Sequence, residues 1–305
     1  MRHVLNPLFL LLVFAGCTAG DAPLTDDVPA DDEPGIVEVV ARGLSFEAPD
    51  SIPSGWTTFR FQNASPLTHF VIIERLPEGT SIVELEKDVS PVFQDAMDLI
   101  NEGRASEGFA QFERLPEWFG EVEYWGGPGF LGPGMTGQTT VHLTPGTYVL
   151  ECYVKTAGRF HSADGMLAQL IVTDEPSNVP EPASTITLTL SNAGIDVQGS
   201  LVSGLNTVKV EFAEQMVHEN MLEHDVHLVR LNEGTDTADV DAWMNWVETS
   251  GLETPAPAEF LGGTHEMPAG EVAYFTVDLS PGSYAWVAEV PSPLEKGMLV
   301  TFTVE

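Results

Sequence analysis

The feature that most constrains the fold is an internal repeat. Residues 75–80 read RLPEGT and residues 230–235 read RLNEGT, and a histidine, His69 or His224, lies six residues before the arginine of each copy. The same register aligns paired glycines at 126–127 and 262–263, and Pro-Gly turns at 145–146 and 281–282. A sequence that matches itself in this way predicts two copies of one domain, and a length of 305 residues accommodates both.

The boundary between the copies is marked by composition. The stretch PSNVPEPAS at 176–184 is rich in Pro and Ser and stands between two strand-like runs. Such a composition is typical of a linker. We therefore expect a first domain over residues 36–174, a linker over 175–184 and a second domain over 185–305.

Within each copy, the outer parts predict strands and the middle predicts a helix. Short runs rich in β-branched and aromatic residues, bounded by Gly, Pro or Asp, cover residues 37–41, 57–61, 70–74, 140–143, 148–154 and 167–172 of the first copy. Residues 82–103 place apolar side chains at helical spacings, interrupted by Pro91, and residues 239–249 take the same part in the second copy. The pattern predicts an all-β protein of two tandem Greek-key β-sandwiches, each with a short helical insertion.

Charge and missing motifs exclude several classes of function. The chain has 46 Asp and Glu against 12 Lys and Arg, a formal charge of −34. Nucleic acid is therefore excluded as a partner, because its phosphates are repelled. The sequence contains no G-x-S-x-G, H-E-x-x-H or C-x-x-C motif, and no Gly-rich phosphate loop followed by Lys. We expect neither a hydrolase nor a nucleotide-dependent enzyme, and no catalytic residues.

The N-terminal segment predicts export and attachment to a membrane. Arg2 and His3 precede an apolar run, 8–14, that is long enough for a signal sequence and too short to span a bilayer. The run ends in FAGC, which resembles the bacterial lipobox, with Phe14 where Leu is usual. The resemblance implies a signal peptide over 1–16, lipidation of Cys17 and a location outside the cytoplasm, at the outer membrane or cell surface. The alternative is an ordinary signal peptide with an incidental cysteine.

Residues 17–35 then predict a disordered tether, since they are acidic, contain several prolines and lack an apolar period. Beyond Cys17, the chain has one other cysteine, Cys152. If Cys17 carries the lipid, Cys152 has no partner for a disulfide. A free cysteine packs as a small apolar side chain when it is inert, and binds a metal as a thiolate when it is functional. Both interpretations of Cys152 are open at this point.

Cys152 stands in a pattern of metal-binding residue types. His69 lies in a strand-like run (LTHFVI, 67–72), Cys152 ends another (GTYVLEC, 146–152), and His161 and Met166 bound HSADGM. The order His, Cys, His, Met resembles that of the cupredoxins, the family of plastocyanin and azurin. The resemblance implies a type 1 copper site in which His69, Cys152 and His161 bind the ion and Met166 is a weak axial ligand. It also implies one-electron transfer with a redox partner protein, or copper handling.

The second copy lacks most of this pattern. Ala288 stands at the position of Cys152 and Pro293 at that of His161, so only His224 and Met298 are retained and the same site cannot form. The second copy also contains further imidazole and thioether side chains. They have two interpretations: a second copper site, since this combination of ligands suits Cu(I), or a chance distribution. They are Met216, His218, Met221, His224, His227, His265 and Met267.

Two interpretations of the whole chain remain open. Eight residues, 153–160, separate Cys152 from His161, more than is usual in the cupredoxins. Closing a longer loop costs little entropy, so the spacing does not decide whether His161 reaches a metal. The chain is either a lipid-anchored copper protein or a metal-free β-sandwich that serves as a binding or structural module at the cell surface.

Overall fold

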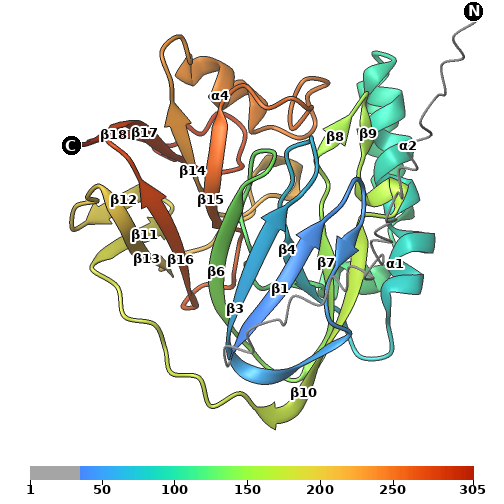
Figure 1. Ribbon diagram of the computed structural model, residues 1–305. Coiled ribbons are helices and arrows are strands. Elements are labelled where there is room, and N and C mark those ends of the chain that lie inside the picture. The colour runs from blue at the N-terminus through green and yellow to red at the C-terminus, as the bar shows by residue number, and fades with distance from the viewer. Residues whose placement is uncertain (1–34) are drawn as a thin grey trace, which may run out of the picture. The chain divides into compact units, whose positions relative to one another are not determined.

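The described part of the chain consists mainly of strands with a few helices (Figure 1). The computed structural model describes residues 35–305. The predicted signal peptide at 1–16, Cys17 and all but the last residue of the predicted tether at 17–35 lie outside the described residues. Within 35–305, none of the helices combines the length and the apolar character needed to span a bilayer.

In the first half, one long strand belongs to two sheets. β3 (Ser51–Asn63) pairs through its first residues with β10 and through the rest with β1 and β6. One sheet contains β2 (Phe46–Glu47), β1 (Ile36–Ala41), β3 and β6 (Thr136–Leu143), and the other adds β10 (Leu167–Pro176), β7 (Gly146–Glu151), β4 (Ile72–Arg75) and β5 (Glu123–Tyr124). Each predicted strand run overlaps one of these strands. The sheets are consistent with a cupredoxin-like sandwich, in which strands that switch sheets form the corners.

Alternation of side chains explains how β3 is placed. Phe59 and Phe61, two residues apart, are fully buried, whereas Arg60 between them is partly exposed. Successive residues of a strand point to opposite faces, so this spacing presents one aromatic face to the core. The neighbouring β1 buries every second residue in the same way.

The second half repeats this pairing. Its strands are β11 (Ile186–Ser191), β12 (Gly194–Gln198), β13 (Gly204–Phe212), β14 (Val226–Leu231), β15 (Glu259–Thr264), β16 (Val272–Leu279), β17 (Gly282–Val287) and β18 (Leu299–Val304). β11 lies parallel to β13, and β13 pairs antiparallel with β16, as β1, β3 and β6 do. The sheet order β15-β14-β17-β18 corresponds to β5-β4-β7-β10. The pairing therefore follows the internal repeat of the sequence.

The two halves share a sheet and a core. β16 pairs antiparallel with β6, with Phe275 opposite Thr139, so a sheet of the first half continues into the second. One cluster of buried apolar side chains runs through both halves. Residues 177–184, between β10 and β11, form neither helix nor strand. The repeat predicted two domains, but it carried no sign that their sheets join.

Helices occur in the insertions predicted for each half. The first half contains α1 (Ile82–Asp88), α2 (Ser90–Asn101) and α3 (Ala105–Phe109), followed by the 3-10 turns η1 (Ala110–Arg114) and η2 (Glu117–Glu121). This insertion is longer than the predicted helical stretch. In the second half, its counterpart is α4 (Thr237–Trp243). Ser81 and Glu84 begin α1 with a capping box. Pro91 lies in the first turn of α2, where its missing N–H is not needed.

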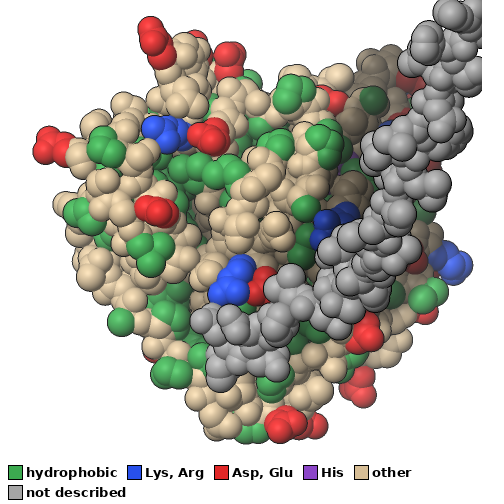
Figure 2. Space-filling model, viewed as in Figure 1, with side chains coloured by type: hydrophobic (Ala, Val, Ile, Leu, Met, Phe, Trp, Pro, Cys, Tyr) green, Lys and Arg blue, Asp and Glu red, His purple; other side chains and the backbone are tan. Residues whose placement is uncertain are grey.

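The surface carries the excess of acidic residues. On the face drawn in Figure 2, Asp and Glu side chains are spread among apolar and polar ones and do not gather into one patch. Several described Arg and Lys side chains form exposed ion pairs, such as Arg42 with Glu47 and Arg114 with Asp95. Pairs of this kind contribute little to stability, because water screens them.

Candidate metal centre

His69 lies just before β4 and is held by its own backbone. Its N–H donates to the Leu131 carbonyl (3.2 Å), and the Leu131 N–H donates to the His69 carbonyl (2.8 Å). The imidazole is fully buried, and its Nε2 is hydrogen-bonded to Ser65 Oγ at 3.0 Å. This bond leaves Nδ1 facing Cys152.

Cys152 follows β7 directly and is linked to two of the other predicted ligands through the backbone. Its N–H donates to the Met166 carbonyl (3.2 Å), and the Met166 N–H donates to the His161 carbonyl (2.9 Å). Cys152 and Met166 are fully buried, and His161 is nearly so. The end of β7 and the start of β10 therefore hold three of the four predicted ligands next to one another.

The long segment between Cys152 and His161 folds into a hairpin. β8 (Lys155–Thr156) pairs antiparallel with β9 (Arg159–Phe160), and the turn between them uses positive φ angles at Ala157 (53°) and Gly158 (77°). The His161 N–H then donates to the Val154 carbonyl at 2.9 Å. The extra residues form this hairpin, so His161 lies next to Cys152 despite the unusual spacing.

Three predicted donor atoms meet at one point. Cys152 Sγ lies 3.5 Å from His69 Nδ1 and 3.8 Å from His161 Nδ1, and the two Nδ1 atoms are 3.1 Å apart. An ion bonded to nitrogen at about 2.0 Å and to sulfur at about 2.3 Å keeps such ligand atoms roughly 3–4 Å apart. The three side chains therefore fit one metal ion, and together with Met166 they resemble a type 1 copper site.

The outer nitrogen of each imidazole is bound to a hydroxyl. Thr156 Oγ1 lies 2.9 Å from His161 Nε2, as Ser65 Oγ does from His69 Nε2 at 3.0 Å. A hydrogen bond at the outer nitrogen fixes the ring orientation of a metal-binding histidine. Neither hydroxyl residue is predictable from the sequence, because a serine or threonine at these positions has no distinctive spacing.

Burial sets the protonation of the cluster. It raises the pKa of the Cys152 thiol to about 12. Burial, and then the neighbouring His161, lowers the pKa of His69 to about 3, and burial lowers the pKa of His161 to about 4. Without a cation the three groups are therefore a neutral thiol and two neutral imidazoles. A metal ion that binds here displaces the thiol proton and supplies the missing positive charge.

The second half holds the ligand hairpin in place. The Lys155 N–H donates to the Leu252 carbonyl (2.8 Å), and the Thr254 N–H donates to the Lys155 carbonyl (2.9 Å). The buried Lys155 ammonium donates to the carbonyls of Trp246 (2.8 Å) and Glu248 (2.6 Å). Thr254 Oγ1 lies 2.7 Å from Thr156 Oγ1, which contacts His161. A chain of hydroxyl groups thus connects the second half to a ligand ring.

The equivalent place in the second half has no ligand set. The Ala288 N–H donates to the Met298 carbonyl (2.9 Å), and the Met298 N–H donates to the Pro293 carbonyl (2.7 Å). These bonds reproduce those among Cys152, Met166 and His161. The alignment of the repeats is therefore confirmed at these positions, and the second half lacks the thiol and one imidazole. His224 instead pairs through Nδ1 with the Glu214 carbonyl at 3.0 Å.

Several solved structures are similar to this chain, at low identity and low TM-score. An auracyanin from Roseiflexus castenholzii is similar over 46% of this chain and 97% of its own, at 23% identity and a TM-score of 0.28. Auracyanin A, a "blue" copper protein from Chloroflexus aurantiacus, covers 45% of this chain and 98% of its own, at 20% identity and 0.28. The blue copper oxidase from Nitrosomonas europaea covers 88% of this chain and 84% of its own, at 12% identity and 0.21.

No family model and no curated protein matches the chain. Likeness to structures this distant transfers no function. The strand pairing of the first half and the order of its candidate ligands are consistent with a cupredoxin-like fold.

Proposed function

We propose that the chain is a lipid-anchored, extracytoplasmic protein of two tandem Greek-key cupredoxin-like domains, of which the first binds type 1 copper. His69, Cys152 and His161 hold the ion, and Met166 is the weak axial ligand. The observation that carries the proposal is the meeting of Cys152 Sγ and two imidazole Nδ1 atoms within 3.8 Å of one another in a buried site. Two imidazoles, a thiolate and a thioether are the donor set of blue-copper electron-transfer sites.

The residues around the cluster suit one-electron transfer or copper handling. Bound copper supplies the one-electron couple, and the protein holds the ligands still. Ser65 and Thr156 fix the two rings, and the backbone bonds of Cys152 and Met166 fix the remaining donors. The proposal assigns no catalytic residue, and electrons exchange with a redox partner protein.

Loading with Cu(II) tests this function. The purified full chain is expected to take up copper at the first site and to show intense visible absorption, because the thiolate transfers charge to the metal. Reduction bleaches this band and reoxidation restores it. Absorption spectroscopy with metal analysis gives the result. A colourless protein after copper uptake, or no uptake, contradicts the proposal and favours a metal-free binding or structural module.

A matched variant separates this site from other histidines. His161→Ala removes one ligand from the cluster and opens a position to water, so the band is expected to shift or weaken. His142→Gln removes an exposed histidine that packs against Trp56 and leaves the cluster intact. If both variants keep the wild-type spectrum, His161 is not a ligand.

The anchor is tested at Cys17, which lies outside the described residues. Cys17→Ser is expected to abolish lipid labelling and to release the protein from membranes, because a hydroxyl cannot form the thioether to the lipid. Labelling with a fatty acid and fractionation of cells give the result. Cys152→Ser is the matched control, since it removes the other thiol and keeps the anchor. Unchanged membrane association of Cys17→Ser contradicts the proposed anchor.

A further inference from the structure

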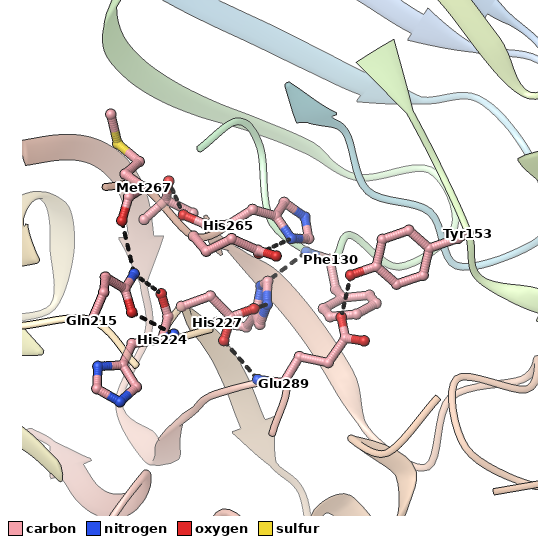
Figure 3. Close-up of polar contacts among 11 residues, drawn as sticks. Phe130, Tyr153, Gln215, His224, His227, His265, Met267 and Glu289 are labelled. Atoms are coloured by element: carbon pink, nitrogen blue, oxygen red, sulfur yellow. Dashed lines mark hydrogen bonds and ion pairs between the residues drawn. The ribbon is translucent and has the colours of Figure 1, made fainter. Parts of the chain in front are cut away.

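A second group of metal-binding side chains lies in the second half. Asp225 and His227 stand at the start of β14, and His265 directly follows β15. One ligand atom from each lies within 4.8 Å of the others, and all three side chains are buried. Figure 3 shows His227 and His265 in this part of the structure. The strand register explains the meeting, because Val226 pairs with Thr264 and this places Asp225 beside His265.

Two members of the group are oriented by hydrogen bonds. His227 Nδ1 accepts from the Phe130 N–H at 3.4 Å, so Nε2 carries the proton that bonds to Asp225 Oδ2 at 2.7 Å. The other oxygen of Asp225 accepts from the Glu289 N–H at 2.6 Å. Asp225 and His227 therefore hold each other in a fixed geometry.

His265 has no such partner. Its ring is fully buried between Phe70 and His227, with centroids 4.4 and 5.0 Å away, and neither ring nitrogen has a hydrogen-bond partner. A carboxylate oxygen of Glu266 lies 4.0 Å from Nδ1, and the Pro128 backbone lies near the ring. A buried polar group without a partner costs about 1–3 kcal/mol, so this ring requires an explanation.

Three buried carboxylates lie close to one another in this part of the second half. Asp225, Glu266 and Glu289 are all nearly inaccessible, and one oxygen of Glu289 has no hydrogen-bond partner while the other accepts from Tyr153. Acidic groups that are withdrawn from water and crowded together are stabilised by a cation among them.

We propose that Asp225, His227 and His265 form a second metal site for a divalent transition-metal ion such as Zn²⁺ or Cu²⁺. Two imidazoles and a carboxylate are ligands for borderline ions, and the absence of a thiolate from this set distinguishes it from the Cys152 site. Binding at His227 Nε2 moves the ring proton to Nδ1, which gives up its long 3.4 Å contact with the Phe130 N–H. The ion then takes the place of that proton beside Asp225 and gives His265 a partner. The proposal does not depend on copper at the first site.

Zinc binding by the full chain tests the proposal. The background is Cys152→Ser, in which the first cluster has lost its thiolate. Metal-free protein of this background is expected to bind about one equivalent of Zn²⁺ in equilibrium dialysis with metal analysis, and a further His265→Gln change is expected to abolish this binding. Adding His142→Gln instead removes an exposed histidine and should leave the equivalent in place.

Several outcomes decide the matter. If Cys152→Ser binds no zinc, or if His265→Gln and His142→Gln reduce binding equally, the second site does not exist. Circular dichroism shows whether His265→Gln folds, and Asp225→Asn replaces it if it does not. In the otherwise wild-type chain, His265→Gln should leave the blue band of the first site unchanged. If the protein binds zinc but shows no blue band after copper loading, the proposed function is contradicted and the second site is not.

Discussion

Replacing Cys152 with serine is expected to abolish the blue absorption of the copper-loaded protein. The band requires charge transfer from sulfur to copper, and an oxygen donor cannot supply it. His69 and His161 remain, held by Ser65 and Thr156, so weak and colourless copper binding can persist. Absorption spectroscopy and metal analysis on the same samples separate the loss of colour from the loss of metal.

The fold should survive this change. The serine hydroxyl takes the place of a thiol that lies 3.5 Å from one imidazole nitrogen and 3.8 Å from another, so it has hydrogen-bond partners at hand. Burying a hydroxyl in place of the thiol costs about 1–3 kcal/mol, which chemical denaturation measures. Cys17→Ser is the control that keeps Cys152. Retention of the blue band in Cys152→Ser means that another residue is the chromophoric ligand.

The first site could be largely predicted from sequence because three of its four ligands lie just before or just after a strand. His69 precedes β4, Cys152 follows β7 and Met166 precedes β10, positions that the pattern of strand-like runs marks out. The position of His161 could not be predicted, since it depends on how residues 153–160 turn back. Gly158 was the one local sign of a turn, and the hairpin also requires Leu252 and Thr254 of the second half.

The second group of metal-binding residues was only partly visible in the sequence. His227 and His265 were among the scattered His and Met residues, but Asp225 was not, because a single aspartate means little in so acidic a chain. Met216 and Met221 of the same set are 43% and 38% exposed, which removes them from the buried cluster. The three ligands meet because β14 pairs with β15. The spacing of residues along the chain does not encode such long-range pairing.

The joining of the two halves also escaped prediction, and it centres on Phe130. This ring belongs to the first half and is fully buried, with Phe70 on one side (4.9 Å between centroids) and Trp243 and Phe260 of the second half on the other (5.1 Å each). It also packs against His227 at 4.4 Å. One aromatic side chain therefore fills the space between the sheet that carries His69 and the strands that carry the second cluster.

Phe130→Ala is expected to lower the free energy of unfolding by about 3–5 kcal/mol, because the cavity left among these rings cannot collapse without moving two sheets. Phe109→Ala is the control. Phe109 is 43% exposed at the end of α3, so its truncation should change the free energy by less than about 1 kcal/mol. Denaturant unfolding of the metal-free variants, followed by tryptophan fluorescence, gives both values. Equal small effects would show that the halves are held together by the β6–β16 pairing and not by the aromatic cluster, since that pairing is unchanged in either variant.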